Sequence, residues 1–354
     1  MPLILFLLPA AYCLLSTILM IIPFFIPHSG CPHQCVFCNQ KKITGQNKSA
    51  EVSSVPQRIN DYLKSDATDE AVQIAFYGGS FTALPVETQK AYLEASRPFI
   101  ESGQAKGIRL STRPDSINRE ILALLKGYHV QTIELGAQSM DDRVLSLSGR
   151  GHSAVDTENA ARLLREEGFL VGLQLMPGLP GDSAEKFIDT VDKIIALKPD
   201  FVRLYPALVI KGTPLEGLYM RGQYTPLSLD EAVSFCSQAL LKFEDAGIEV
   251  IRIGLQPTEE LEKPGTILAG PYHPAFRQVV ESSILLDRMK ALLTNSKPSR
   301  LEVTFLVNPG DISAAVGQKR SNTECLKNQF ALKIIHVRPD QSVPRRTVKL
   351  AREN

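Results

Sequence analysis

The sequence predicts an α/β protein, a partial TIM-like (β/α)6 barrel followed by a small C-terminal α/β domain. Short apolar runs alternate with longer amphipathic runs along most of the 354 residues, as in parallel strands joined by helices. Polar, glycine-bearing segments follow the apolar runs, at the strand ends where parallel α/β folds build their sites. Six such units predict an open barrel rather than the closed form of eight, although periodicity alone also fits an open doubly wound sheet.

The elements are expected in alternation. The predicted strands are Ile21–Ile26, Val72–Tyr77, Ile108–Ser111, Thr132–Leu135, Leu170–Leu175 and Phe201–Leu204. The predicted helices are Val55–Lys64, Pro85–Glu101, Ile117–Lys126, Ala154–Glu167 and Ala184–Leu197, with a further helix at Ser228–Ala246 and a strand at Ile248–Ile253. Proline and glycine become frequent between Pro257 and Pro274, which predicts a link. We therefore expect a barrel over residues 20–256 and a C-terminal unit over 257–354.

Residues 1–19 form an apolar leader, and the first 27 residues carry no charged side chain. The leader lacks the basic start of a signal peptide. Because Ile21–Ile26 is needed as the first strand, the remainder is at the short end for a membrane span of about 20 residues. The leader is therefore expected to cap the open bottom of the barrel, or to precede a true start at Met20, rather than to anchor the chain in a membrane.

Three of the six cysteines, Cys31, Cys35 and Cys38, lie within eight residues. Such clustering in a large chain indicates a metal site rather than disulfides. Thiolates are the usual ligands of iron–sulfur clusters, and three of them leave one iron of a four-iron cluster open. The alternative is a zinc site completed by His28 or His33, in a zinc-stabilised binding module without enzymatic activity.

The pattern CxxxCxxC, with Phe37 before the last cysteine, resembles the signature of the radical S-adenosylmethionine (SAM) superfamily. The resemblance implies that Cys31, Cys35 and Cys38 hold a [4Fe-4S] cluster whose open iron chelates SAM. Reductive cleavage of SAM then gives a 5′-deoxyadenosyl radical. It also implies an electron donor such as flavodoxin or ferredoxin, and an oxygen-sensitive cluster that favours the reducing cytoplasm.

The same resemblance assigns cofactor-binding residues. Gly78, Gly79 and Ser80 match the superfamily's glycine motif after the second strand, and Phe37 is expected to lie against the adenine. Gln138, Gln174 and Arg203 are polar residues at or within apolar strands, where they are disfavoured unless they serve a site or a buried network. His152 has two interpretations. It is either a proton donor or substrate contact near the site, or a structural histidine that caps the following helix, and the structural role is slightly favoured.

A closer resemblance is to the Elongator catalytic subunit family, whose radical domain modifies the wobble uridine of tRNA. It rests on six segments: Tyr77–Pro85, Ser111–Asp115, Glu134–Ser139, Gly149–His152, Met176–Pro180 and Arg203–Pro214. Eukaryotic members space their first two cysteines farther apart and continue into an acetyltransferase domain. We expect no such domain in this chain, because its tail carries no acetyl-coenzyme A loop. The resemblance predicts tRNA or another RNA as substrate, with a small-molecule oxidase or decarboxylase, like the oxygen-independent coproporphyrinogen oxidases, as the alternative.

The tail is basic, although the whole chain has a net charge of +1. Residues 284–354 hold 13 Lys and Arg against 6 Asp and Glu, about seven net positive charges, which favours contact with an anion. Strands are expected at Arg300–Leu306 and Phe330–Val337. The segment between them resembles the helix–loop–helix of a KH domain, whose GxxG loop clamps a nucleic-acid backbone. Gly317, Lys319 and Arg320 are the candidate contacts, with Arg320 in place of the second glycine; a small packing domain is the alternative.

Overall fold

The computed structural model describes residues 19–27, 29–45, 49–65, 71–296 and 301–351. The predicted leader therefore lies almost wholly outside the described residues. Within them, no helix is long and apolar enough to cross a membrane.

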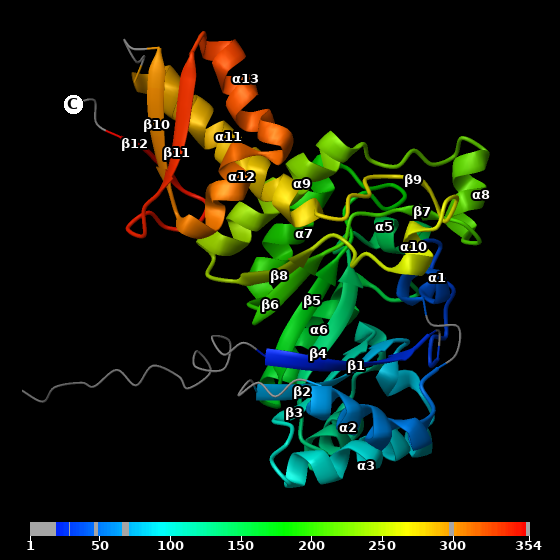
Figure 1. The fold of residues 1–354 in the computed structure, drawn as a ribbon. Coiled ribbons are helices and arrows are strands. Elements are labelled where there is room, and N and C mark those ends of the chain that lie inside the picture. Colours follow the sequence, from blue (N-terminus) through cyan, green and yellow to red (C-terminus); the bar gives the residue numbers. More distant parts are fainter. Residues whose placement is uncertain (1–18, 28, 46–48, 66–70, 297–300, 352–354) are drawn as a thin grey trace, which may run out of the picture.

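The main sheet has seven strands, and all of its pairings are parallel. In sheet order they are β1 (Leu19–Ile26), β2 (Ala71–Gly78), β3 (Gly107–Thr112), β4 (Val130–Gln138), β5 (Leu170–Leu175), β6 (Phe201–Leu204) and β8 (Glu249–Ile253). The edge strands β1 and β8 do not pair with each other, so the sheet is a curled, open half-barrel (Figure 1). The predicted fold class is confirmed, and the strand expected at Ile248–Ile253 adds a seventh to the six predicted.

Helices connect successive strands and pack against the outside of the sheet (Figure 1). They are α2 (Val55–Ser65), α3 (Val86–Glu101), α4 (Arg119–Gly127), α6 (Ala154–Glu166), α7 (Ala184–Leu197) and α9 (Leu229–Asp245). Four of them begin at a side chain that accepts a backbone N–H of the first turn, from Asn118, Ser153, Ser183 and Ser228. These caps satisfy donors that a helix start otherwise leaves unpaired.

The first strand shows why the site opens inside the sheet. Ile22, Phe24 and Ile26 are buried in the main core, whereas Ile21, Pro23 and Phe25 line a cavity on the inner face. Successive side chains of a strand point to opposite faces. One apolar face of β1 therefore packs in the core, and the other apolar face lines the cavity. Pro23 lacks a backbone donor and is tolerated because β1 is an edge strand. The prediction of a first strand at Ile21–Ile26 is confirmed.

Short elements lie over the carboxyl ends of the strands (Figure 1). They are α1 (Gln40–Thr44), α5 (Asp142–Leu147), α8 (Pro214–Met220), α10 (Glu259–Glu262), β7 (Val209–Ile210) and β9 (Ile267–Ala269). The segment interpreted as a link thus packs on the barrel: β9 pairs with β7, and Leu261 is buried with Leu208 and Ile210. The few apolar residues of the segment from Pro257 to Pro274 make this contact. The high proline and glycine content of the segment gives no sign of the contact in the sequence.

The C-terminal unit has its own core. It contains α11 (Phe276–Ser296), β10 (Glu302–Val307), α12 (Ile312–Val316), α13 (Ser321–Phe330), β11 (Ile334–Pro339) and β12 (Val348–Leu350), with β10 parallel to β11 and antiparallel to β12. Helix α11 joins both cores, since Val280 lies in the barrel core and Met289 in the second. The strand expected from Phe330 begins later, because α13 continues to Phe330 and ends at Ala331 in a left-handed conformation (φ 53°).

Candidate active site

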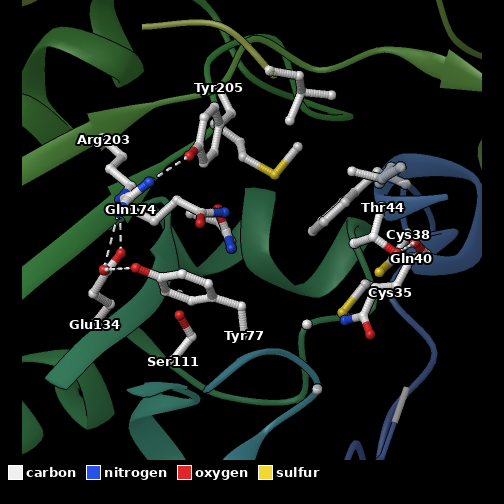
Figure 2. Close-up of a pocket in the computed structure, with 18 of the residues that line it drawn as sticks. Cys35, Cys38, Gln40, Thr44, Tyr77, Ser111, Glu134, Gln174, Arg203 and Tyr205 are labelled. Carbon is white, nitrogen blue, oxygen red and sulfur yellow. Dashed lines mark hydrogen bonds and ion pairs between the residues drawn. The ribbon is translucent and has the colours of Figure 1, made fainter. Parts of the chain in front are cut away.

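The three clustered cysteines follow β1 and line one cavity of about 720 Å³ at the carboxyl end of the sheet. Cys35 is buried, and Cys31 and Cys38 are half-buried. Figure 2 shows Cys35 and Cys38 on one side of this cavity and the side chains of Tyr77, Glu134 and Arg203 on the other. The cavity is within the size range of ligand pockets, so a bound group can bridge the two walls.

The cysteine loop is fastened to the glycine motif after β2. The Ser80 N–H donates to the Ser29 carbonyl at 2.9 Å. A Cβ added at Gly79 would lie 2.1 Å from that carbonyl oxygen, and one at Gly30 would lie 2.3 Å from the Ser80 carbonyl oxygen. Gly30 also has φ +72°, a conformation that side chains disfavour. The glycines are thus required where two backbones touch, and this contact fixes where the cysteines lie.

The turn that contains Arg150 and Gly151 supports the cysteine loop from the side of β4. Nη1 of Arg150 donates to Sγ of Cys35 at 3.2 Å, and its Nη2 donates to the carbonyl of Gly136. Arg113 in turn donates to the carbonyl of Arg150. A Cβ at Gly151 would lie 2.3 Å from the ring of His33. A buried guanidinium therefore lies against a sulfur of the cysteine loop and holds it in place.

Two of the three thiols, those of Cys31 and Cys38, have raised pKa values. Burial, followed by the neighbouring sulfurs of Cys35 and Cys31, raises the pKa of Cys38 to about 12. Burial and Cys35 also raise the pKa of Cys31. Within the described residues, no three His, Cys, Asp or Glu side chains are arranged to hold a metal ion. An iron–sulfur cluster does not require three ligands on one ion, because each thiolate binds a different iron. Three thiols from one loop that face one cavity therefore fit a cluster with an open iron. His28 lies outside the described residues.

The opposite wall is a buried ion-pair network. Glu134 on β4 lies 2.7 Å from Nε of Arg203 on β6 and 3.1 Å from Nη1 of Arg109 on β3. The Tyr77 hydroxyl donates to Glu134 at 3.3 Å, and Arg203 donates to the Tyr205 hydroxyl at 3.2 Å. One carboxylate therefore holds two guanidinium groups, which leaves this wall with a net positive charge.

The network shifts the titration of its members. Burial and the charge of Glu134 raise the pKa of Tyr77, so that the hydroxyl stays protonated. Burial is the largest single effect on Arg203 and disfavours its charged form. Glu134, Tyr205 and Tyr77 together outweigh burial and raise the pKa of Arg203. Arg203 thus remains a cation at the cavity wall.

Gln138 and Gln174 lie between the two walls. Gln138 has φ +68°, and the pairing of β4 with β5 is irregular between Leu135 and Gln138. Nε2 of Gln174 donates to Oε1 of Gln138 at 3.3 Å. A non-glycine residue in this conformation beside an irregular strand is typical of a site that redirects a side chain. The amides are thereby directed toward the cavity (Figure 2 shows Gln174).

The structure brings the predicted cluster and cofactor residues to one cavity. Its lining includes Cys31, Cys35, Phe37, Cys38, Gly78, Gly79, Ser80, Gln138, Gln174 and Arg203. Phe37 also packs in a small apolar cluster with Leu179 and Tyr224. The hydroxyl of Ser80 is 3.0 Å from that of Thr112.

Other residues of the site were not singled out from the sequence. Glu134, Arg109, Arg150 and Arg252 belong to this group, and each except Arg109 lines the cavity. Glu134, Arg109 and Arg252 are charged residues within short strands. Charged side chains are rarely buried unless they are paired. A charged residue that interrupts an apolar run was therefore the sequence feature that could have indicated these site residues.

Two other predicted residue sets lie elsewhere. His152 does not cap the following helix, since Ser153 accepts the N–H of Asp156 there. Its Nε2 donates to the Ala137 carbonyl at 3.3 Å, and it lines a second cavity of about 370 Å³ outside the cysteine loop. Gly317, Lys319 and Arg320 lie on the C-terminal unit, away from the main cavity.

Comparison with known families places the site in a known context. A model of the Radical SAM superfamily matches residues 25–194, and a model of the Radical_SAM C-terminal domain matches residues 199–285. The solved structure of the Methanocaldococcus infernus Elp3, with an N-terminal deletion, superposes with a TM-score of 0.58 at 23% identity, covering 79% of this chain and 63% of that one. That likeness supports the fold.

Curated relatives match between about half and three fifths of this chain. An uncharacterized protein of Methanocaldococcus jannaschii is 30% identical over 220 residues, 58% of this chain and 66% of its own length. The tRNA uridine(34) acetyltransferase of Methanocaldococcus infernus is 29% identical over 251 residues, 59% of this chain and 47% of its own. Human Elongator complex protein 3 is 29% identical over 204 residues, covering 52% and 37%. The chain thus spans between 37% and 66% of the length of these three relatives. It is a member of the radical S-adenosylmethionine superfamily of enzymes.

Proposed function

We propose that this enzyme modifies RNA, with transfer RNA as its substrate. The observation that carries this proposal is the similarity of the chain to enzymes named tRNA uridine(34) acetyltransferase, at 29–30% identity over 251 residues. The charge of the cavity agrees with a polyanionic substrate. Among the described residues that line it, four are arginines and one is a glutamate. The superfamily implies a [4Fe-4S] cluster and SAM, which when bound would supply the radical that abstracts hydrogen from the substrate.

The cavity residues that were predicted to bind the cluster and SAM each have a proposed task. Cys31, Cys35 and Cys38 would hold the cluster, and Arg150 would orient Cys35 and offset part of the thiolate charge. The backbone of Gly78, Gly79 and Ser80 would bind the methionine end of SAM, and Phe37 would lie against its adenine. Gln138, Gln174 and Arg203 would orient the cofactor's polar groups from the opposite wall. The apolar face of β1 would exclude water from the space beside them.

The C-terminal unit is proposed as a second contact with RNA. Gly317 to Arg320 form the turn between α12 and α13, and Lys319 and Arg320 are exposed there. Arg320 occupies the position of the second glycine in a GxxG loop, yet its φ of +66° is one that glycine adopts readily. The backbone thus keeps a glycine-like path while the side chain adds a positive charge. Lys319→Gln combined with Arg320→Gln should weaken tRNA binding and reduce its salt dependence.

Reduction of the cluster requires an electron donor, for which we propose a small electron-transfer protein such as flavodoxin or ferredoxin in a reducing cytoplasm. The donor would have to approach the cysteine loop from outside the main cavity, because the cavity is reserved for SAM and substrate in this proposal.

Binding of tRNA tests the proposed substrate. The reconstituted enzyme should bind tRNA with an affinity that falls steeply as salt rises, because phosphate contacts release counterions. Modified nucleosides from a deletion strain, compared with those of its parent, should lack one modification that the intact gene restores. Absence of tRNA binding at low salt, together with an unchanged nucleoside profile, would contradict the proposal and favour a small-molecule substrate.

A further inference from the structure

Arg252 lines the active-site cavity, and its side chain has no partner among the described residues. It lies on β8 directly opposite Arg203 on β6, and both side chains line the cavity. Two like charges side by side on neighbouring strands destabilise a sheet unless something neutralises them. The fold therefore maintains a charge arrangement that is unfavourable in the absence of a ligand.

Within the described part of the chain, only one member of this arginine pair has a counter-charge. Glu134 contacts Arg203 at 2.7 Å, and the same carboxylate also serves Arg109 at 3.1 Å. It is the only acidic side chain among the described lining residues. No side-chain hydrogen bond or ion pair joins Arg252 to another residue in the part of the chain that the structure describes. Its guanidinium group thus keeps all of its donors for a ligand.

The place of Arg252 indicates the part of the ligand that it meets. Strand β8 is one edge of the open sheet and β1 is the other, and both contribute to the cavity lining. Strand β1 contributes the apolar residues Ile21, Pro23 and Phe25 to the same cavity. Cys35 and Cys38 lie on the other side of the cavity from the ion-pair network (Figure 2). The cavity therefore has an apolar wall and a cation at the same open side.

We propose that Arg252 is the anion site for the substrate, and that it binds a backbone phosphate next to the nucleotide that enters the cavity. A nucleotide has one group for each of these two features. Its flat base can pack on the apolar wall, and its phosphate can bind the guanidinium group. Arginine binds phosphate with two parallel hydrogen bonds, which fix orientation as well as charge. The inference rests on the proposed RNA substrate and adds the residue that positions it.

Salt-dependent binding of tRNA by the reconstituted enzyme tests this site. Arg252→Gln should weaken binding by about tenfold and reduce the slope of log affinity against log salt by about one, the share of one phosphate contact. Arg252→Lys should keep most of the slope but lose part of the affinity, since it keeps the charge and loses the paired hydrogen bonds. Iron content and the thermal midpoint of each variant report whether it folds.

Lys198→Gln is the matched control. Lys198 is exposed just before β6, at the opposite end of the sheet from the cavity, and its replacement removes the same charge. It should leave affinity and salt slope unchanged. If the wild-type enzyme binds tRNA and Arg252→Gln binds it with the same affinity and slope, the Arg252 site is overturned while the RNA substrate stands. If the wild type shows no salt-dependent binding of tRNA, both proposals fail.

Discussion

Glu134 on β4 and Arg203 on β6 form an ion pair of 2.7 Å that spans the intervening strand β5 inside the half-barrel. Both side chains are largely buried. Their carboxylate and guanidinium form the wall that faces the cysteines across the cavity (Figure 2). The barrel interior is therefore organised by charge as well as by apolar packing, and this wall is open to test.

Replacement of Glu134 by Gln should destabilise the protein strongly. The change leaves the guanidinium groups of Arg203 and Arg109 buried without their counter-charge. Loss of one partner of a buried pair costs about 3–5 kcal/mol. Urea unfolding of the cluster-free protein should show that decrease. Glu87→Gln on α3, whose partner Lys90 is exposed, is the control and should change unfolding little. A wild-type midpoint for Glu134→Gln would show that the network does not organise the barrel.

Replacement of Gly79 by Ala should displace the cysteine loop. The added Cβ would lie 2.1 Å from the Ser29 carbonyl oxygen and 2.6 Å from that of Ile26, and backbone cannot turn away as a side chain can. Such overpacking costs about 1–3 kcal/mol. The iron bound after anaerobic reconstitution should fall together with the stability. Gly127→Ala, where a Cβ would meet nothing within 4 Å, should behave as wild type. Full iron loading in Gly79→Ala would contradict the close contact of the two loops.

The stability of the protein should fall on acidification in a window set by His152. Burial, and then the charges of Arg150 and Arg113, lower the pKa of His152 from 6.5 to about 4. The unfolded chain therefore takes up a proton below pH 6.5 that the folded chain refuses until about pH 4, so stability is lost between these values as pH falls. The loss from this one group is about 2 kcal/mol between pH 7 and pH 5.

His152→Gln isolates that contribution. The amide stays neutral at every pH, and it retains a donor for the Ala137 carbonyl. The difference in unfolding free energy between wild type and variant should therefore change with pH by about 2 kcal/mol over this range. Parallel pH profiles of the two proteins would show that His152 is solvated enough to titrate normally.

The fold was largely predictable because each of its main strands has at least one buried face and therefore appears in the sequence as an apolar run. Leu170–Leu175 and Phe201–Leu204 were predicted with the observed bounds, since apolar runs of that length have few other uses. The segment from Pro257 to Pro274 was harder. Its contact with the barrel depends on a pairing between β9 and β7, more than fifty residues apart, which local composition does not reveal.

The site was predictable where chemistry demands rare residues and not where it depends on pairing. Cys31, Cys35 and Cys38 carry their own spacing, so the sequence indicates them directly. Glu134 and Arg252 are ordinary charged residues whose roles appear only when strands distant in sequence become neighbours. Gln138 was expected at the site, but its left-handed backbone (φ 68°) follows from an irregular strand pairing that no local residue preference predicts.

The most direct test measures the bound iron and the cleavage of SAM on the same protein sample. The anaerobically reconstituted wild type should bind about four irons per chain and, when reduced, convert SAM to 5′-deoxyadenosine. Cys31→Ala, Cys35→Ala and Cys38→Ala should each abolish the cleavage. Cys325→Ala, which alters a free cysteine of the C-terminal unit, should leave both quantities unchanged. One zinc per chain with no 5′-deoxyadenosine would contradict the account and identify the cysteine loop as a structural zinc site.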